Sequence, residues 1–411
     1  MNLRRSAAVL AAVAVIGAAA PAAADPSPSP SKPALPSALY GDSDPQYDGV
    51  WRQSLALLAQ HTADVEPPKA AVDWLTGQQC ADGSFAPYRA DTAKACDDRT
   101  TVDTNQTAAA VQALAALGGH DAVTDKAVGW LKSVQNTDGG WGYVAGGASD
   151  TNSTSVVIGA LAAAGEKPAE VKKDGKSPYD ALLGLALPCE GDGAGAFAFQ
   201  PDKKGTLIAN ADATAAGVLG STGAGLAAGP GKGGQADAAC ATADSPGQAA
   251  ANGAAYLTKA LAGSGHLVSA LPGAEDQPDY GNTADAVVAL AAQGSTEQAG
   301  AAADWLEKNA AGWAAQSGPA AYAQLIFAAH ATGADPRAFG GTDLVERLTA
   351  TGPAPEKAAQ PSDDKGDKGD KDEKKDDSDS GFGVWWFVGV CLIAGIGIGF
   401  LFSGRAKKQQ P

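Results

Sequence analysis

The feature that most constrains the fold is an internal repeat with a period of about fifty residues. The stretch KAAVDWLTGQQCADGSFAPY, which begins at Lys69, aligns with KAVGWLKSVQNTDGGWGY, which begins at Lys126. Each is followed by a second similar block, DTNQTAAAVQALAALGG from Asp103 and DTNSTSVVIGALAAAG from Asp150. A unit therefore consists of a helix, a turn rich in glycine and aromatic residues, and a capped second helix that ends at glycine.

Fainter copies of both blocks continue toward the C-terminus. NADATAAGVLGSTG from Asn210 and DYGNTADAVVALAAQG from Asp279 match the second block, and AAADWLEKNAAGW from Ala301 matches the first. The second helices are apolar nearly all round, which is typical of an interior, whereas the first helices carry charges on one face. We predict an all-α fold over residues 45–350, an α/α toroid in which about five or six helical hairpins form a closed double layer. An open superhelix is the alternative.

The turn in the two clear units resembles the QW repeat of squalene and terpenoid cyclases. It reads Gln-x-x-x-Gly-x-aromatic after a Trp-Leu helix. Protein prenyltransferase β subunits, complement thioester domains and cobalamin carriers are related α/α toroids. In that family the Gln side chain caps a neighbouring helix and the aromatic ring stacks on it. The resemblance implies this structural clasp for Gln79 with Phe85 and for Gln135 with Trp141.

Both ends of the chain indicate an exported, membrane-anchored protein. Residues 1–24 combine Arg4 and Arg5 with a short apolar run and small residues, as in a cleaved secretory signal. Four further segments are expected: a Pro/Ser-rich spacer at 25–44, a charged disordered stalk at 351–381, a transmembrane helix at 382–402 and a basic cytoplasmic tail at 403–411. The toroid is therefore expected outside the cell membrane, above a single C-terminal span.

Cysteine usage agrees with an oxidising compartment. Cys391 falls in the expected span, which leaves an even number of cysteines in the exported part. Among the three possible pairings we favour Cys80–Cys96 and Cys189–Cys240, because each closes a loop within a neighbouring segment. Metal binding is the competing interpretation, but no C-x-x-C or nearby histidine supports it. The net charge of −16 argues against nucleic acid as a partner.

Catalytic motifs of the enzymes with this fold are not found in the sequence. The strings nearest to the cyclase acid motif Asp-x-Asp-Asp-Thr-Ala are CDDRTT at Cys96 and NADATA at Asn210, where Asp212 stands alone. The zinc triad of prenyltransferases has no counterpart around Cys189 or Cys240. Cyclase cavities also use many aromatic rings to stabilise cations, whereas the second helices here carry Ala, Val and Leu.

The sequence therefore favours a non-catalytic module that binds a ligand or a partner. An isoprenoid- or terpenoid-processing enzyme and a structural or adhesion head are the alternatives. Among the related toroids, cobalamin carriers best match an exported, disulfide-linked ring without catalytic residues, so the resemblance implies a corrinoid delivered to a membrane importer. The small β domain that closes those carriers is not found here, so a separate lid protein would supply it. No other cofactor is expected.

Polar residues at the starts of the second helices are the candidate ligand contacts. If these helices run in parallel around the ring, their first residues gather at its mouth. The competing interpretation is that each residue simply caps a helix. The candidates are Asp103, Thr104, Asn105, Asp150, Thr151, Asn152, Asn210, Asp212 and Asp279.

Overall fold

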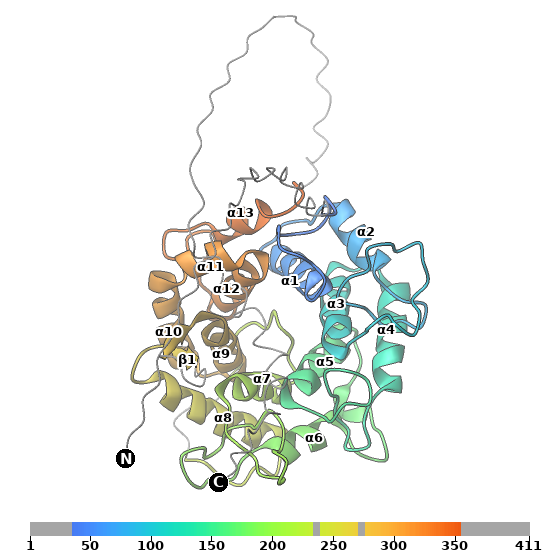
Figure 1. The fold of residues 1–411 in the computed structure, drawn as a ribbon. Helices are drawn as coiled ribbons and strands as arrows, with labels where there is room; N and C mark the ends of the chain where they lie inside the picture. Colours follow the sequence, from blue (N-terminus) through green and yellow to red (C-terminus); the bar gives the residue numbers. More distant parts are fainter. Residues whose placement is uncertain (1–34, 233–238, 270–275, 355–411) are drawn as a thin grey trace, which may run out of the picture. The chain divides into compact units, whose positions relative to one another are not determined.

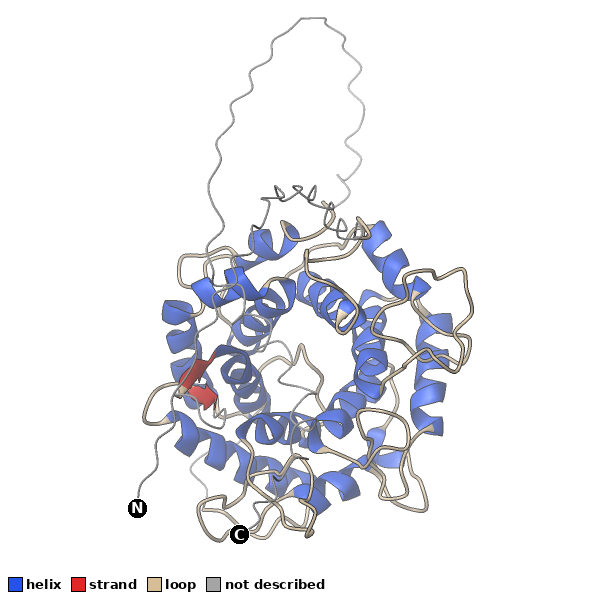
Figure 2. Cartoon of the chain, viewed as in Figure 1, coloured by secondary structure: helices blue, strands red, loops and turns tan. Residues whose placement is uncertain are grey.

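Two concentric layers of helices make up the fold, as Figures 1 and 2 show. The computed structural model describes residues 35–232, 239–269 and 276–354, and every element named here lies in the compact unit that begins at Pro36. The inner layer consists of α1 (Gly49–Thr62), α3 (Thr104–Leu117), α5 (Thr151–Ala163), α7 (Ala211–Ser221), α9 (Tyr280–Gln293) and α12 (Pro319–Thr332). The outer layer contains α2 (Lys69–Gly77), α4 (Asp121–Ser133), α6 (Pro178–Leu185), α8 (Pro246–Leu261) and α10 (Thr296–Asn309).

Smaller elements complete the described part of the chain. They are the 3-10 helix η1 (Pro168–Glu170), the short helices α11 (Ala311–Ser317) and α13 (Leu344–Thr349), and the strands β1 (Leu267–Ser269) and β2 (Gln277–Asp279). The two strands pair in antiparallel register, with Leu267 opposite Asp279.

The inner layer is a closed ring. Each inner helix packs against the next one along the chain, and α12 packs against α1. The predicted α/α toroid is thereby confirmed for residues 36–354, and the open superhelix is excluded. Because the ring closes within these residues, this segment has a complete core of its own.

The division into layers follows from the side chains of each helix. Helix α5 is buried without interruption from Thr151 to Leu161, as expected for a helix that contacts protein on all sides. Helix α4 buries only one face, which includes Trp130 and Leu131. Small residues permit the close contacts of the inner ring: a Cβ on Gly220 of α7 would lie 2.5 Å from the Ser155 hydroxyl of α5.

A threonine hydroxyl fastens the turn that precedes each of four inner helices. The hydroxyl oxygen accepts the backbone N–H of a residue in the turn, and the pairs are Phe85 with Thr107 (3.0 Å), Trp141 with Thr154 (3.1 Å), Phe197 with Thr214 (3.0 Å) and Leu267 with Thr283 (3.0 Å). Phe197 and Leu267 thus take the places of Phe85 and Trp141 in the later units. This relationship gives the register of the faint repeats.

The two glutamines of the clear units each link their own turn to the following unit. Gln79 Nε2 donates to the carbonyl oxygens of Gly83 (3.1 Å) and Val123 (2.8 Å). Gln135 Nε2 donates to Gly139 (2.8 Å) and to Val171 (3.3 Å) in the same way. Phe85 and Trp141 are both fully buried, and Trp141 Nε1 donates to the Leu131 carbonyl at 2.7 Å.

Disulfides join Cys80 to Cys96 and Cys189 to Cys240. These are the two pairings that the loop argument favoured. The first encloses a sequence separation of 16 residues and the second one of 51.

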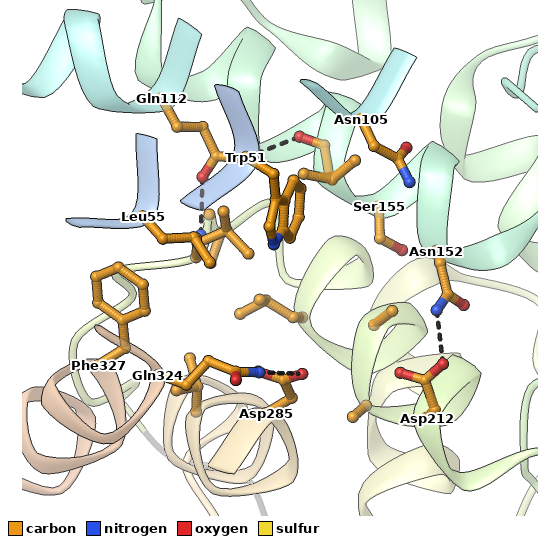
Figure 3. Close-up of a pocket in the computed structure, with 18 residues that line it drawn as sticks. Trp51, Leu55, Asn105, Gln112, Asn152, Ser155, Asp212, Asp285, Gln324 and Phe327 are labelled. Carbon is orange, nitrogen blue, oxygen red and sulfur yellow. Dashed lines mark hydrogen bonds between the residues drawn. The ribbon is translucent and has the colours of Figure 1, made fainter. Parts of the chain in front are cut away.

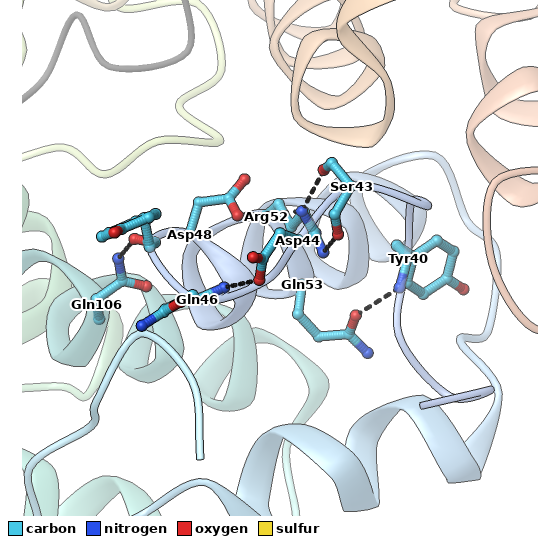
Figure 4. Close-up of polar contacts among 9 residues, drawn as sticks. Tyr40, Ser43, Asp44, Gln46, Asp48, Arg52, Gln53 and Gln106 are labelled. Atoms are coloured by element: carbon cyan, nitrogen blue, oxygen red, sulfur yellow. Dashed lines mark hydrogen bonds and ion pairs between the residues drawn. The ribbon is translucent and has the colours of Figure 1, made fainter. Parts of the chain in front are cut away.

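An N-terminal arm of residues 36–48, part of which belongs to the expected spacer, packs on α1 (Figure 4). The Tyr40 N–H donates to Gln53 Oε1 at 2.9 Å, and the Tyr40 hydroxyl donates to Gln60 at 2.8 Å. The buried Arg52 donates to the Ser43 carbonyl at 2.8 Å and pairs with Asp48 at 3.0 Å. The arm therefore fixes the start of the first inner helix.

No helix within the described residues is long and apolar enough to cross a membrane. The expected signal at 1–24, transmembrane helix at 382–402 and tail at 403–411 lie outside the described residues, as do the first part of the spacer and nearly all of the stalk.

Candidate functional site

A cavity lies inside the ring, and all six inner helices contribute to its wall (Figure 3). Its empty volume is about 780 Å³, which includes the part that is open to solvent. The lining residues are Trp51, Leu55, Asn105, Gln112, Asn152, Ser155, Val156, Asp212, Ala215, Ala216, Leu219, Ala224, Gly225, Leu226, Asp285, Val288, Gln324 and Phe327.

One end of the ring is occupied by residues 223–231, which we call the plug. It follows α7 and crosses toward the C-terminal halves of the other inner helices. The Leu226 N–H donates to Gln112 Oε1 on α3 at 2.8 Å, and the Gly231 N–H donates to the Ala291 carbonyl on α9 at 2.9 Å. A Cβ on Gly225 would lie 2.4 Å from Gln112 Oε1, so a larger residue there would displace the Gln112 side chain or the plug. The opposite end, where the inner helices begin, is the mouth.

Two carboxyl groups, Asp212 on α7 and Asp285 on α9, belong to the cavity wall. Asp212 Oδ2 accepts a hydrogen bond from Asn152 Nδ2 at 2.9 Å. Both oxygens of Asp285 lie 3.2 Å from Gln324 Nε2. Among the described residues that line the cavity there is no Lys, Arg or His, so neither carboxyl group has a basic partner there.

The surrounding protein raises the pKa of both carboxyl groups. Desolvation is the main cause for Asp212, and it raises the pKa to about 6, against the hydrogen bond from Asn152. Desolvation also raises the pKa of Asp285 to about 7, and the charge of Asp212 adds to the effect. Both side chains are partly accessible, but only toward the cavity, so bulk water solvates their charge poorly. Both groups therefore bind protons at a higher pH than an exposed aspartate does.

Three buried oxygens in the wall lack a hydrogen-bond partner within the described part of the chain. They are Asn105 Oδ1, Asn152 Oδ1 and Ser155 Oγ, on side chains that are 3%, 8% and 5% exposed. A buried polar group without a partner costs about 1–3 kcal/mol. Each oxygen atom is itself almost inaccessible to solvent, so a bound molecule gains a hydrogen bond to it only if the side chain turns toward the cavity.

The structure divides the nine candidate ligand contacts into two groups. Asn105, Asn152 and Asp212, each the second residue of an inner helix, line the cavity. The other six do not: Asp103, Thr104, Asp150, Thr151, Asn210 and Asp279.

Helix capping accounts for most of this second group. Asp103 and Asp150 accept the backbone N–H groups of Gln106 at 2.7 Å and Ser153 at 2.6 Å, and burial raises their pKa to about 7 and about 6. Asn210 and Asp279 cap α7 and α9 in the same way. The expectation that these caps face the mouth is corrected for Asp103, Thr104, Asp150 and Thr151, which are at most 1% exposed.

Several cavity residues escaped the sequence reasoning, above all Asp285 and Gln324. Each is the sixth residue of its helix, in the runs YGNTADAVVALAAQ and PAAYAQLIFAAHAT. Asp285 is the one charged side chain of the first run, and Gln324 lies directly between two apolar residues of the second, which was a usable signal. Trp51, Gln112 and Ser155 also belong to the wall and carried no comparable signal.

Comparison with known proteins agrees with this fold. Residues 51–182 match the family model of the prenyltransferase alpha-alpha toroid domain. The match covers the first part of the ring, from α1 into α6.

Two solved structures are similar to the chain at low sequence identity. One is the ent-copalyl diphosphate synthase from Streptomyces platensis, at 17% identity and a TM-score of 0.45, over 69% of this chain and 50% of the synthase. The other is a sugar epimerase from a ruminal bacterium, at 15% identity and a TM-score of 0.41, over 66% of this chain and 79% of the epimerase. The chain thus spans half the length of the synthase. A comparison with curated proteins gives no significant match.

Proposed function

We propose that this protein is a non-catalytic toroid that binds a small molecule in the cavity inside its ring, outside the cell membrane. The observation that carries the proposal is the set of three buried oxygens without partners, at Asn105, Asn152 and Ser155, in the wall of one cavity. A folded chain without a ligand function tends to pair such groups or to replace them with apolar ones.

The rest of the wall supports the same proposal. Leu55, Val288 and Phe327 supply apolar surface, and the two carboxyl groups are held by hydrogen bonds from Asn152 and Gln324. Such a combination is typical of sites for small organic molecules. A structural or adhesion head is less well supported, because a ring with only that role has no need for a cavity.

Because the plug occupies the other end, the ligand enters through the mouth in this proposal. A corrinoid remains our candidate for a bulky ligand that extends beyond the mouth, with a separate lid protein to cover it and a membrane importer to receive it. The C-terminal segment would anchor the toroid beside that importer.

Asp212 and Asp285 favour a second function, an isoprenoid- or terpenoid-processing enzyme. A carboxyl group that keeps its proton near neutral pH in an apolar cavity is suited to act as a general acid. Asp285 is the better candidate for the proton donor because its pKa is the more strongly raised. The few aromatic rings in the wall speak against cation chemistry on a large isoprenoid.

Native mass spectrometry of residues 25–354, recovered from the cells that produce the protein, tests the binding proposal. The spectra are repeated after addition of cobalamin and of cobinamide. We expect a retained or added mass with the natural sequence and with Ala301→Trp, a control on the exposed face of α10. Ala216→Trp fills the cavity and should abolish that mass. A bare mass under all conditions would contradict ligand binding.

Product analysis separates binding from catalysis. The protein is incubated with squalene and with geranylgeranyl diphosphate, and the extracts are analysed by gas chromatography and mass spectrometry. The binding proposal expects unchanged substrates. A product that forms with the natural sequence and disappears with Asp285→Asn would establish the enzyme instead.

A further inference from the structure

We infer that the ligand of this cavity is an organic cation whose positively charged group lies between Asp212 and Asp285 and whose apolar part packs against the wall near Trp51. This inference rests on the proposed function and names the chemical class of the ligand.

The ionisable groups in the cavity wall favour a positively charged ligand. Every ionisable side chain in its described wall is acidic, and the two carboxyl groups are close enough for the charge of Asp212 to act on Asp285. A cation between them replaces repulsion by two attractions in a site of low dielectric constant. An anion such as a diphosphate would find no basic side chain there.

The part of the wall around Asp212 has an excess of hydrogen-bond acceptors. Asn152 Nδ2 donates to Asp212 Oδ2, the orientation that the amide group requires when Asp212 is ionised. Asn152 Oδ1 then has no partner, and Ser155 Oγ lies unpartnered on the same helix. An ammonium group has donors and no acceptor, so it satisfies carboxylate and carbonyl oxygens together.

Trp51 supplies an aromatic face in the cavity wall. Its ring belongs to α1, which lies across the ring of helices from α7, and Figure 3 shows it extending into the cavity. An indole ring offers a large apolar face against which the uncharged part of the ligand packs. Leu55 and Phe327 extend this wall with apolar surface for the rest of the ligand.

The raised pKa values of the two carboxyl groups agree with a missing positive charge. Binding of a cation should lower both pKa values and release protons near pH 6 to 7. The titratable groups that act on this site are Asp212 and Asp285 in the wall, with Asp150 and Asp279 near the starts of α5 and α9. The described wall residues from α1, α3, α5 and α12 are not ionisable.

A matched pair of probes tests the inference, namely 1-adamantanamine and 1-adamantanol, which differ by one charged group on the same apolar cage. Isothermal titration calorimetry is carried out with residues 25–354 at pH 5 and pH 8. We expect the amine to bind about tenfold more tightly than the alcohol at pH 8, and this preference to shrink at pH 5. Titration in buffers of different ionisation enthalpy should show proton release near pH 6.5.

Single variants complete the test. Asp212→Asn and Asp285→Asn should each weaken binding of the amine by about 10- to 100-fold and leave binding of the alcohol unchanged. Asp304→Asn, on the exposed face of α10, is the control and should change neither affinity. If the alcohol binds as tightly as the amine and the variants make no difference, the cationic ligand is refuted while ligand binding stands. If neither probe binds, both proposals are refuted for molecules of this size.

Discussion

The backbone N–H of Trp141 donates a hydrogen bond to Thr154 Oγ1 at 3.1 Å, so the glycine-aromatic turn is fixed to the inner helix that follows it. Both groups are buried, and the same hydroxyl lies 3.3 Å from the Trp141 carbonyl. The relationship recurs at Thr107, Thr214 and Thr283. A threonine in the first turn thus links each of four inner helices to the turn that precedes it.

Replacement of Thr154 by valine should destabilise the toroid by about 1–3 kcal/mol, because it leaves the buried Trp141 N–H without an acceptor while keeping the side-chain shape. Urea unfolding followed by tryptophan fluorescence measures the change. Thr222→Val is the control, since that hydroxyl is exposed and bonds only the Leu219 carbonyl. Equal destabilisation by the two variants would show that the hydrogen bond between Trp141 and Thr154 contributes no more than an exposed one.

The threonine of this hydrogen bond could be read from the sequence, but two of the turns that it binds could not. Threonine is the fifth residue of DTNQT, DTNST, NADAT and DYGNT, so the register of the inner helices was present in the blocks themselves. The turns that precede Asn210 and Asp279 were not recognisable, because Phe197 and Leu267 are reached without the Gln-x-x-x-Gly pattern. A backbone N–H makes this bond whatever its side chain, so the sequence of the turn is free to vary.

The pH dependence of stability should report the raised pKa of Asp285. Between about pH 4 and pH 7 the folded chain retains a proton that the unfolded chain has released, so the free energy of unfolding falls as the pH rises through this window. Asp285→Asn removes the titrating carboxyl group and with it this pH-dependent loss of stability. The variant should therefore be more stable than the natural sequence by about 1–3 kcal/mol at pH 8 and equal to it below pH 4.

Thermal unfolding across this pH range provides the measurement for Asp285. Asp304→Asn serves again as the exposed control, with a flat difference expected at all pH values. A constant difference between Asp285→Asn and the natural sequence at pH 4 and pH 8 would mean that this carboxyl group is not desolvated in the folded chain.

Gly225→Ala should loosen the plug. The new Cβ would lie 2.4 Å from Gln112 Oε1, so the Gln112 side chain or the loop is displaced and the hydrogen bond from the Leu226 N–H to this oxygen is weakened or lost. Hydrogen exchange at the Leu226 amide should accelerate about tenfold or more. Gly247→Ala is a suitable comparison because its Cβ has open space on α8. Unchanged exchange at Leu226 would show that the plug is not held by Gln112.

The two disulfides should differ in their contribution to stability. Serine variants that remove the Cys189–Cys240 bridge, which spans 51 residues, should lose about 1 kcal/mol more than those that remove the Cys80–Cys96 bridge, which spans 16. The longer loop restricts the unfolded chain more. Urea unfolding of the two double variants gives the comparison, and the reverse order would point to folded-state contacts as the dominant effect.

Three of the predicted contact residues line the cavity and four others are buried away from it. Asn105, Asn152 and Asp212 were predicted from their positions in the first turns of inner helices and line the cavity, whereas the adjacent Asp103, which caps α3, and Thr104 are buried. Adjacent residues of a helix face different directions, and only the packing of both layers decides which one faces the cavity. Asp285 was not predicted because it is the sixth residue of α9, one turn beyond the capping positions at the start of the helix.

A crystal structure of residues 25–354 with 1-adamantanamine tests the central claim most directly. We predict electron density for the probe inside the ring, with its nitrogen within hydrogen-bond distance of Asp212 and Asp285 and its cage against Trp51. Density only on the outer surface, or a cavity that stays empty at saturating probe, would contradict a ligand site within the ring.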